Sequence, residues 1–257
     1  MTPRELLDPL RIGFNDLITN IKLDPDHSDI ILTRTIDHIN NVVENSRILA
    51  SSLELNSNEI AMAEIAALFH DIGRLTDLLP DSYAKYSNHA DASIEYLKLN
   101  ADFLQLDIKT QEIIIQIIRN HNKPELPKKE NENVLFYIKL LRDADKLEVW
   151  RETSNFLIRK SGKPNMSIDL ALSDKAVVTP AFCKIIIDGG IPDKKDLVTI
   201  NDLVIFQMAW VFDLNFKKSF QIVNQKQYIR HLYESLPKND NVIEIYRMIR
   251  IYIENRI

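Results

Sequence analysis

Apolar residues recur at helical spacing along most of this 257-residue chain, and this periodicity constrains the fold more than any other feature. One stripe is formed by Ile36, Ile39, Val42 and Val43. Only five glycines are present, and most of the ten prolines lie between periodic segments, so long stretches are free to be helical. No alternating pattern typical of a β-strand extends beyond a few residues. The chain is therefore predicted to be all-α.

Several helix ends are marked by the residues that favour them. Asn56 is followed three residues later by Glu59, as in a capping box, and Gly73 is expected to stop the helix that starts there. Asp240 is the expected N-cap of the last helix. Further helices are expected near residues 88–99, 108–121, 133–160, 179–188, 200–213, 215–235 and 241–256.

Charge and cysteine content exclude some classes of partner. The net charge of −5 gives no basic surface for extended nucleic acid, although a local basic pocket can still bind a small anion. The single cysteine, Cys183, allows no intramolecular disulfide and fits a reducing compartment. The N-terminus lacks the apolar core of a signal peptide, and no window approaches 18 apolar residues. We expect a cytoplasmic protein without a membrane segment.

Histidines and aspartates gather in the first 150 residues, on or at the ends of separate predicted helices. A helical bundle builds a metal site in this way, by projecting single ligands inward from several helices. The candidate metal ligands are His38, His70, Asp71, His89, His121 and Asp145. Imidazole and carboxylate without thiolate suit transition metals and are poor for calcium. We expect one or two divalent ions, with iron or manganese favoured and cobalt, nickel, zinc or magnesium as alternatives.

These residues and their order resemble the H…HD…D signature of the HD-domain metal-dependent phosphohydrolase superfamily. The stretch "HDIGR" (70–74) is similar to its second motif, and "LRDADKLE" (141–148) is similar to its last motif. The resemblance covers roughly residues 30–155. It implies a helical bundle of the HD-domain type, with additional C-terminal helices.

The resemblance also implies a role for each ligand. One ion would be held by His38, His70, Asp71 and Asp145, and Asp71 would bridge to a second ion held by His89 and His121. Asp143 is the alternative to Asp145. Residues two apart on a helix point about 200° apart, so only one of these two aspartates can face the site. Asp145 matches the motif and is preferred.

Four residues are candidates for catalysis. Besides Asp71, Arg74 and Lys146 each follow a ligand closely and are expected to stabilise a transferring phosphoryl group. The alternatives are that Arg74 caps a helix end and that Lys146 is solvated. Asp77 is a candidate general acid, with an ordinary surface aspartate as the alternative.

The expected function is hydrolysis of a phosphoester or phosphoanhydride in a small substrate, with a nucleotide as the first choice. The segment "RNHNKPELP" (119–127) lacks the Gly-Tyr-Pro motif and paired histidine of cyclic-dinucleotide phosphodiesterases, which argues against that activity. Two other classes remain open. Some similar proteins are di-iron oxygenases of small polyols or phosphonates, and others are non-catalytic signalling modules.

We expect the metal-binding domain to span residues 1–160, with its core at 30–155. Residues 161–257 carry no motif, and their apolar and aromatic positions at helical spacing are typical of core. We expect them to pack on the first domain as one structural unit with it, and to shape its pocket or form a homodimer face.

Overall fold

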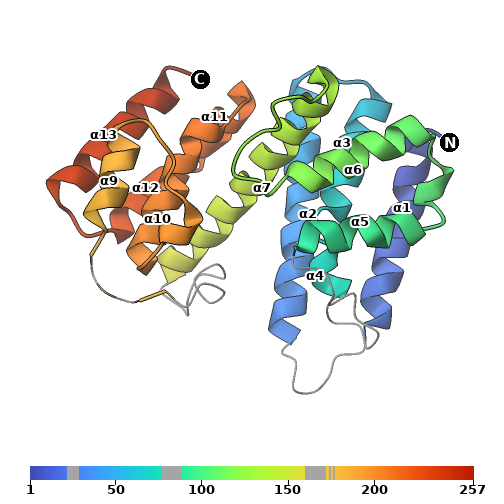
Figure 1. Ribbon diagram of the computed structural model, residues 1–257, viewed down its shortest axis with the longest axis horizontal. Coiled ribbons are helices and arrows are strands. Elements are labelled where there is room, and N and C mark those ends of the chain that lie inside the picture. The colour runs from blue at the N-terminus through green and yellow to red at the C-terminus, as the bar shows by residue number, and fades with distance from the viewer. Residues whose placement is uncertain (22–28, 77–87, 160–171, 174, 176) are drawn as a thin grey trace. The chain divides into compact units, whose positions relative to one another are not determined.

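The computed structural model describes residues 1–21, 29–76, 88–159, 172–173, 175 and 177–257. Its regular elements are helices (Figure 1), and the one β pairing within these residues is an isolated bridge between Ser173 and Thr199. The predicted all-α fold is confirmed. None of the described helices combines the length and the apolar character that a membrane crossing requires.

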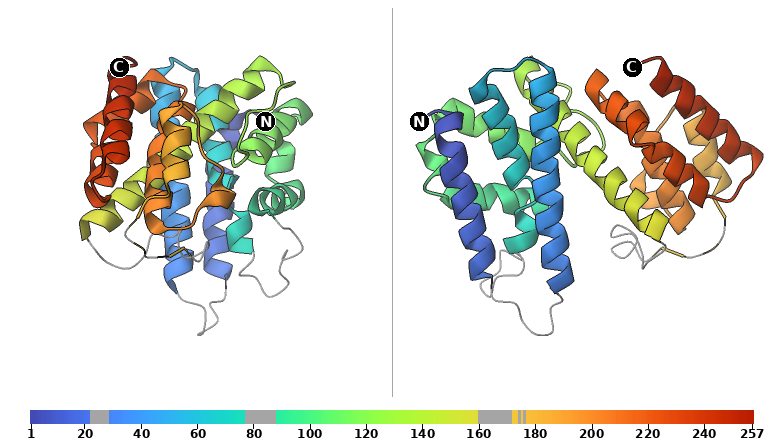
Figure 2. Two further views of the ribbon diagram at one scale, coloured as in Figure 1. Left: turned by 60° about the vertical axis from the view of Figure 1, so that its left-hand side comes forward. Right: turned by 180° about the vertical axis from the view of Figure 1, so that it is seen from behind.

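The described chain forms two compact units, Met1–Asp145 and Lys146–Ile257, and the division falls inside helix α7. The N-terminal unit contains α1 (Pro3–Asn20), α2 (Asp29–Ser52), α3 (Ser57–Phe69), α4 (Gly73–Thr76), α5 (His89–Leu99), η1 (Phe103–Gln105), α6 (Ile108–Asn120) and the first part of α7 (Glu132–Arg159). Helices α1 and α2 run antiparallel, and α3 packs against both (Figures 1 and 2). Helix α6 in turn packs against α3 and α5.

Helix α3 is the centre of the N-terminal unit. Every residue from Ala61 to Phe69 is buried, because α3 is covered on several sides by α1, α2 and α6. Ile39 and Val42, from the predicted apolar stripe on α2, are fully buried. The C-terminal end of α3 therefore opens into the interior of the unit, where His70 and Asp71 follow.

Capping residues explain where several helices begin. The predicted capping box is confirmed, since Asn56 accepts hydrogen bonds from the backbone N–H of Glu59 while the Glu59 carboxylate accepts from that of Asn56. Helix α1, which the periodicity did not mark, begins with a second capping box formed by Thr2 and Glu5. Asn88 caps α5 through the N–H of Ala90.

The C-terminal unit contains the rest of α7 with α9 (Pro180–Ile187), η2 (Lys194–Asp196), α10 (Ile200–Ala209), η3 (Trp210–Asp213), α11 (Lys217–Gln225), α12 (Tyr228–Ser235) and α13 (Asp240–Glu254). Helix α10 packs against α9 and α12, and α13 packs against α9 and α12. Trp150 of α7 is fully buried, and its indole N–H donates to the Gln207 carbonyl at 3.0 Å. This anchors α7 to α10 within the unit.

Three helix ends differ from expectation. The segment 215–235 is not one helix, because Gln227 adopts a left-handed conformation (φ 55°) between α11 and α12, at a break that no glycine or proline marks. The last helix is capped by Asn239 rather than Asp240, and the Asn239 side chain accepts from the N–H of Val242. Helix α3 ends at Phe69, and Gly73 starts α4 instead of stopping α3.

The expected domain boundary at residue 160 falls outside the described residues. The packing of residues 161–257 on the metal-binding domain, and the homodimer, stay predictions.

Candidate metal centre

The imidazole ring of His70 is hydrogen-bonded to the C-terminal end of α3. Its Nδ1 lies 2.7 Å from the carbonyl oxygen of Ala67, and since a carbonyl only accepts, Nδ1 carries the hydrogen. This bond satisfies one of the carbonyls that a helix end leaves unpaired. It also leaves Nε2 with a lone pair. His70 is fully buried, and Nε2 has no hydrogen-bond partner within the described residues.

His121 repeats this arrangement at the end of α6. Its Nδ1 donates to the carbonyl of Ile118 at 2.6 Å, again three residues earlier. The bond fixes the tautomer and the ring orientation, as a carbonyl partner does for many metal-binding histidines. In this tautomer the hydrogen of the neutral ring is on Nδ1, which leaves Nε2 of His70 and of His121 as acceptors, and the two ring centroids lie 5.1 Å apart.

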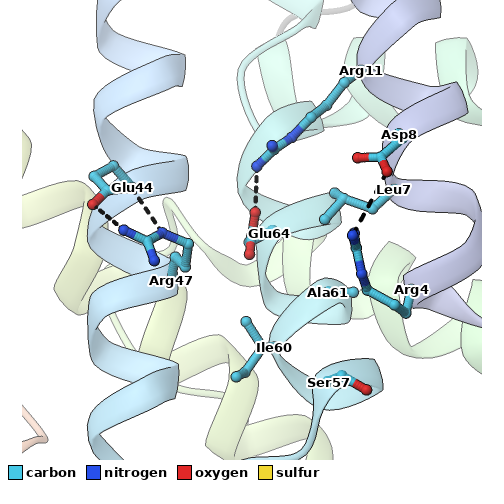
Figure 3. A pocket seen from close by; sticks show the side chains of 10 residues that line it. All are labelled: Arg4, Leu7, Asp8, Arg11, Glu44, Arg47, Ser57, Ile60, Ala61 and Glu64. Carbon is cyan, nitrogen blue, oxygen red and sulfur yellow. Dashed lines mark hydrogen bonds and ion pairs between the residues drawn. The ribbon is translucent and has the colours of Figure 1, made fainter.

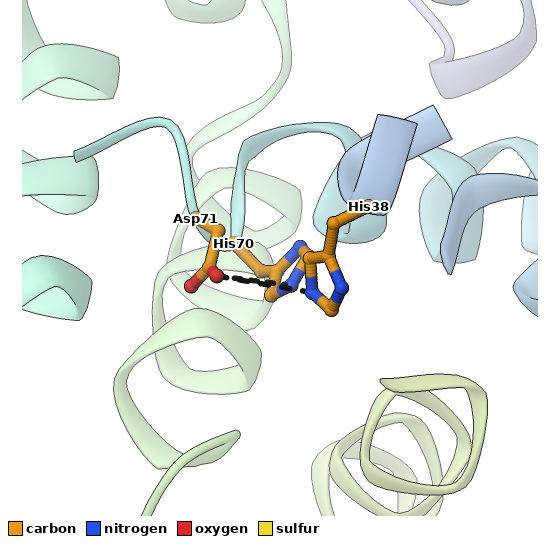
Figure 4. A group of neighbouring side chains, drawn as sticks. All are labelled: His38, His70 and Asp71. Carbon is orange, nitrogen blue, oxygen red and sulfur yellow. Dashed lines mark ion pairs between the residues drawn. The ribbon is translucent and has the colours of Figure 1, made fainter. Parts of the chain in front are cut away.

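Asp71 lies between two pairs of histidines. Its Oδ1 is 3.0 Å from Nε2 of His89 and 3.5 Å from Nε2 of His121. Its Oδ2 is 3.8 Å from Nε2 of His38 and 3.9 Å from Nε2 of His70. Figure 4 shows His38 and His70 turned toward the Asp71 carboxylate. Each carboxylate oxygen thus faces a different pair of imidazoles, and the two groups share only Asp71.

Asp145 joins the group from α7. Its Oδ1 lies 3.3 Å from Nε2 of His38, and about a quarter of its side chain is exposed. Asp143, the alternative, is fully buried on the same helix. The contact with His38 is the observation that favours Asp145.

His89 is the first residue of α5 and the most exposed of the cluster's histidines, with 21% of its side chain accessible. Its Nε2 lies 3.3 Å from Nε2 of His121. The Asn122 amide lies 3.1 Å from the same His89 atom and donates to the side chain of Asn88, the N-cap of α5. The turn after α6 is thereby linked to the start of α5.

Burial and neighbouring groups shift the pKa of three residues in the cluster. It lowers the pKa of His70 to about 4, and the neighbouring Asp71 carboxylate offsets only part of this effect. For Asp71, burial alone would raise the pKa, but the charges of His70 and Arg74 outweigh it and hold the pKa well below its usual range. For Asp145, burial also acts upward, and the contact with His38 outweighs it to lower the pKa. At neutral pH the cluster combines a neutral His70 with ionised carboxylates.

The donor set fits a divalent metal ion. Ligand atoms about 2.1 Å from one ion stand about 3.0 Å apart at right angles and about 4.2 Å apart when opposite. The separations within the two groups, from 3.0 to 3.9 Å, fall in this range. Two of the atoms, Nε2 of His70 and Oδ1 of Asp71, are buried and make no hydrogen bond within the described residues, although Oδ1 is close to His89. Buried polar atoms of this kind call for a ligand.

The structure places the other candidates as follows. Arg74 Nε donates to Oδ2 of Asp71 at 2.7 Å, and 45% of its side chain is exposed. Lys146 is buried and pairs with Asp213 at 2.6 Å within the C-terminal unit, so the alternative of a solvated lysine is wrong. Its part in catalysis stays a prediction. Asp77 lies outside the described residues.

Two buried residues that the sequence did not single out hold the ligand-bearing turns. The Ser93 hydroxyl of α5 donates to the carbonyl of His70 at 2.9 Å and accepts the N–H of Gly73 at 2.9 Å. Arg142 of α7 donates to the carbonyl of His121 at 3.4 Å and to that of Lys123. Both partners are distant in sequence, so no local spacing signals these contacts.

A pocket of about 390 Å³ lies elsewhere in the N-terminal unit, between α1, α2 and α3 (Figure 3). None of its lining residues belongs to the histidine–aspartate cluster. Its charged residues neutralise one another in the pairs Arg4–Asp8, Arg11–Glu64 and Arg47–Glu44. We assign the chemistry to the cluster because imidazole and carboxylate atoms converge there, and two of them, Nε2 of His70 and Oδ1 of Asp71, are buried without a hydrogen bond among the described residues.

A protein-family model described as HD domain matches residues 35–150, the segment that carries all six clustered residues. Residues 35–150 are therefore similar to the HD domain. HD domains bind divalent metal ions and define a superfamily of metal-dependent phosphohydrolases, so the predicted resemblance is confirmed. Neither the curated proteins nor the solved structures gave a match to the chain.

Proposed function

We propose that this HD domain holds two divalent ions and hydrolyses a phosphoester or phosphoanhydride bond in a small substrate. The observation that carries the proposal is the position of Asp71. One of its oxygens faces His38 and His70, and the other faces His89 and His121. A carboxylate placed in this way can bridge two ions, with Asp145 completing the group around His38.

The protonation states of His70 and the two aspartates suit the binding of cations. His70 is neutral at pH 7 because burial lowers its pKa, so its Nε2 lone pair is available for an ion. The two aspartates carry the negative charge that offsets bound cations. When bound, a pair of divalent ions activates water and neutralises the charge of a phosphoryl group.

Arg74 is the candidate for contact with the substrate. Its guanidinium holds Oδ2 of Asp71, and nearly half of the side chain is accessible. A planar guanidinium has five N–H donors, so it can orient a carboxylate and also meet a phosphate oxygen. We propose that Arg74 does both at the exposed edge of the cluster.

The substrate class is proposed as a nucleotide or another small phosphorylated molecule. The family assignment supports phosphate chemistry, and the chain's net charge of −5 offers no basis for binding long nucleic acids. Phosphate release should be measured with nucleoside mono- and triphosphates, dinucleoside polyphosphates and p-nitrophenyl phosphate, after loading with Mn²⁺ or Fe²⁺.

Oxygen uptake should be recorded in parallel. Metal-dependent phosphate release that Asp71→Ala abolishes supports the proposal. Oxygen uptake with a polyol or phosphonate, and no phosphate release from the panel, would instead identify a di-iron oxygenase. Metal binding without either reaction would favour a non-catalytic module.

A further inference from the structure

Helices α4 and α5 pack against each other, and Gly73 of α4 contacts Ser93 of α5 there; we name this pair the Gly73–Ser93 junction. Ser93 is fully buried, and its single hydroxyl makes two hydrogen bonds of 2.9 Å, one to the carbonyl of His70 and one from the N–H of Gly73. The hydroxyl therefore ties α5 to both ends of the turn that contains Asp71.

The junction requires glycine at position 73 because its neighbours leave no space for a side chain. A Cβ atom at this position would lie 2.2 Å from the carbonyl oxygen of His89 and 2.8 Å from Cβ of Ala92 and N of Ser93. Real Cβ atoms essentially never come within 3.0 Å of such neighbours. Any larger residue must push α5 away, and the first atom it displaces belongs to the backbone of His89.

The junction thus controls the distance between His89 and Asp71. His89 starts α5 one turn before Ser93, and its Nε2 is 3.0 Å from Oδ1 of Asp71. The contact between His38 and Asp145 depends on α2 and α7, which the two Ser93 hydrogen bonds do not reach. The His70 ring also keeps its own bond to Ala67.

We infer that Gly73 and Ser93 are positioning residues that set the occupancy of one metal position, formed by Asp71, His89 and His121, separately from the other. The inference rests on the proposed function, because it assumes two positions. Removal of the Ser93 hydroxyl lets α5 shift relative to the Asp71 turn and lowers the affinity for the ion near His89. The ion near His38 keeps its ligands in place.

The test is a calorimetric titration of Mn²⁺ into the metal-stripped full chain, for wild type, Ser93→Ala, Gly73→Ala and a matched control. The control is Ser46→Ala, because Ser46 is an equally buried serine in the same unit whose hydroxyl has no hydrogen-bond partner within the described residues. Thermal unfolding in chelator reports the stability of each variant without metal. This measurement distinguishes a variant in which a ligand has moved from a variant in which the fold itself is destabilised.

We expect wild type and Ser46→Ala to bind two ions with the same affinities. Ser93→Ala should bind the first ion within two-fold of wild type and the second about ten-fold or more weakly, the usual effect of removing a residue that orients a ligand. Gly73→Ala should lose the second ion altogether. If Gly73→Ala does not fold, Ser93→Ala decides the matter alone.

Two results would overturn the inference while leaving the proposed function intact. One is a wild type with two ions and Ser93→Ala with both affinities unchanged. The other is an equal loss of both ions in Ser93→Ala. A wild type that binds fewer than two ions would refute the binuclear site itself, and the inference with it.

Discussion

Each unit of the molecule buries an aspartate, and the two carboxylates differ in what surrounds them. In the C-terminal unit, Asp202 is fully buried and accepts hydrogen bonds from the hydroxyl and N–H of Thr179 and from the N–H groups of Val198 and Thr199. In the N-terminal unit, Asp71 is also buried, yet its neighbours are mainly imidazole nitrogens, with Arg74 as its guanidinium partner.

The difference shows that burial of a carboxylate does not by itself mark a functional site. Asp202 is satisfied by donors from its own chain, at the start of α10, and it stabilises that helix start. Asp71 meets side chains whose nitrogens, in His70 and His121, have already used their hydrogens on helix carbonyls. Nε2 of His70 is thus a buried acceptor without a hydrogen-bond donor among the described residues, and such an atom is suited to a cation from outside the chain.

The largest expected effect is the loss of activity in Asp71→Ala. Because Asp71 belongs to both metal groups, its removal should lower metal-dependent phosphate release by at least about 1,000-fold, the order expected when ions and their activated water are lost. Asp202→Ala, which removes an equally buried carboxylate, should keep the metal content and activity per folded molecule. Similar activity losses in the two variants would show that the surroundings of Asp71 do not distinguish it functionally from Asp202.

The second effect is acid destabilisation of the metal-stripped N-terminal unit. His70 has a pKa of about 4 in the folded state and about 6.5 when unfolded, so the unfolded chain binds more protons between these values. The contribution of His70 to the free energy of unfolding is fully present above about pH 6.5. It is lost as the pH falls toward 4, and the loss amounts to about 3 kcal/mol. Urea unfolding at pH 7.5, 5.5 and 4.5 measures it. His70→Gln should remove the step, and an unchanged stability between pH 7.5 and 4.5 in wild type would contradict it.

The third effect belongs to the C-terminal unit. Asp202→Ala leaves the N–H groups of Thr179, Val198 and Thr199 without their carboxylate, and this should lower the free energy of unfolding by about 2–3 kcal/mol. Alkylation of Cys183 reports it, because this thiol is buried and burial raises its pKa, which slows reaction in the folded state. Faster alkylation is expected in Asp202→Ala and not in Asp71→Ala.

The smallest effect is expected for Arg74→Gln. The Arg74 side chain is about half exposed, so the free energy of unfolding should change by less than about 1 kcal/mol. Metal affinity should fall about ten-fold because Asp71 loses a partner that orients it. Arg47→Gln is the matched control, since Arg47 is an arginine of similar exposure paired with Glu44 in the same unit. Equal metal affinities in the two variants would show that Arg74 does not position Asp71.

Much of the fold follows from local patterns in the sequence. The helical stripes and the Asn56 capping box predicted most of the described helices, and the order of histidines and aspartates predicted the residues that come together near Asp71. The stripes and the capping box are readable because each depends on residues a few positions apart, and the histidines and aspartates are readable because their order resembles a known family signature. The HD-domain match covers the same segment.

The remaining features depend on contacts between distant segments. Ser93 is an ordinary helix residue until α5 lies against the Asp71 turn, and Gly73 resembles a helix stop until its lack of a Cβ is seen to admit His89. The Lys146–Asp213 pair also joins positions far apart in sequence. Helical spacing carries no information about such partners.

The most direct test of the central claim is the metal content per chain, measured by elemental analysis on protein purified without chelator, for wild type and His121→Ala. Because His121 faces only one oxygen of Asp71, we expect about two transition-metal ions per chain in wild type and about one in the variant. One ion in both proteins, or none after reconstitution of the wild type, would contradict a binuclear centre bridged by Asp71.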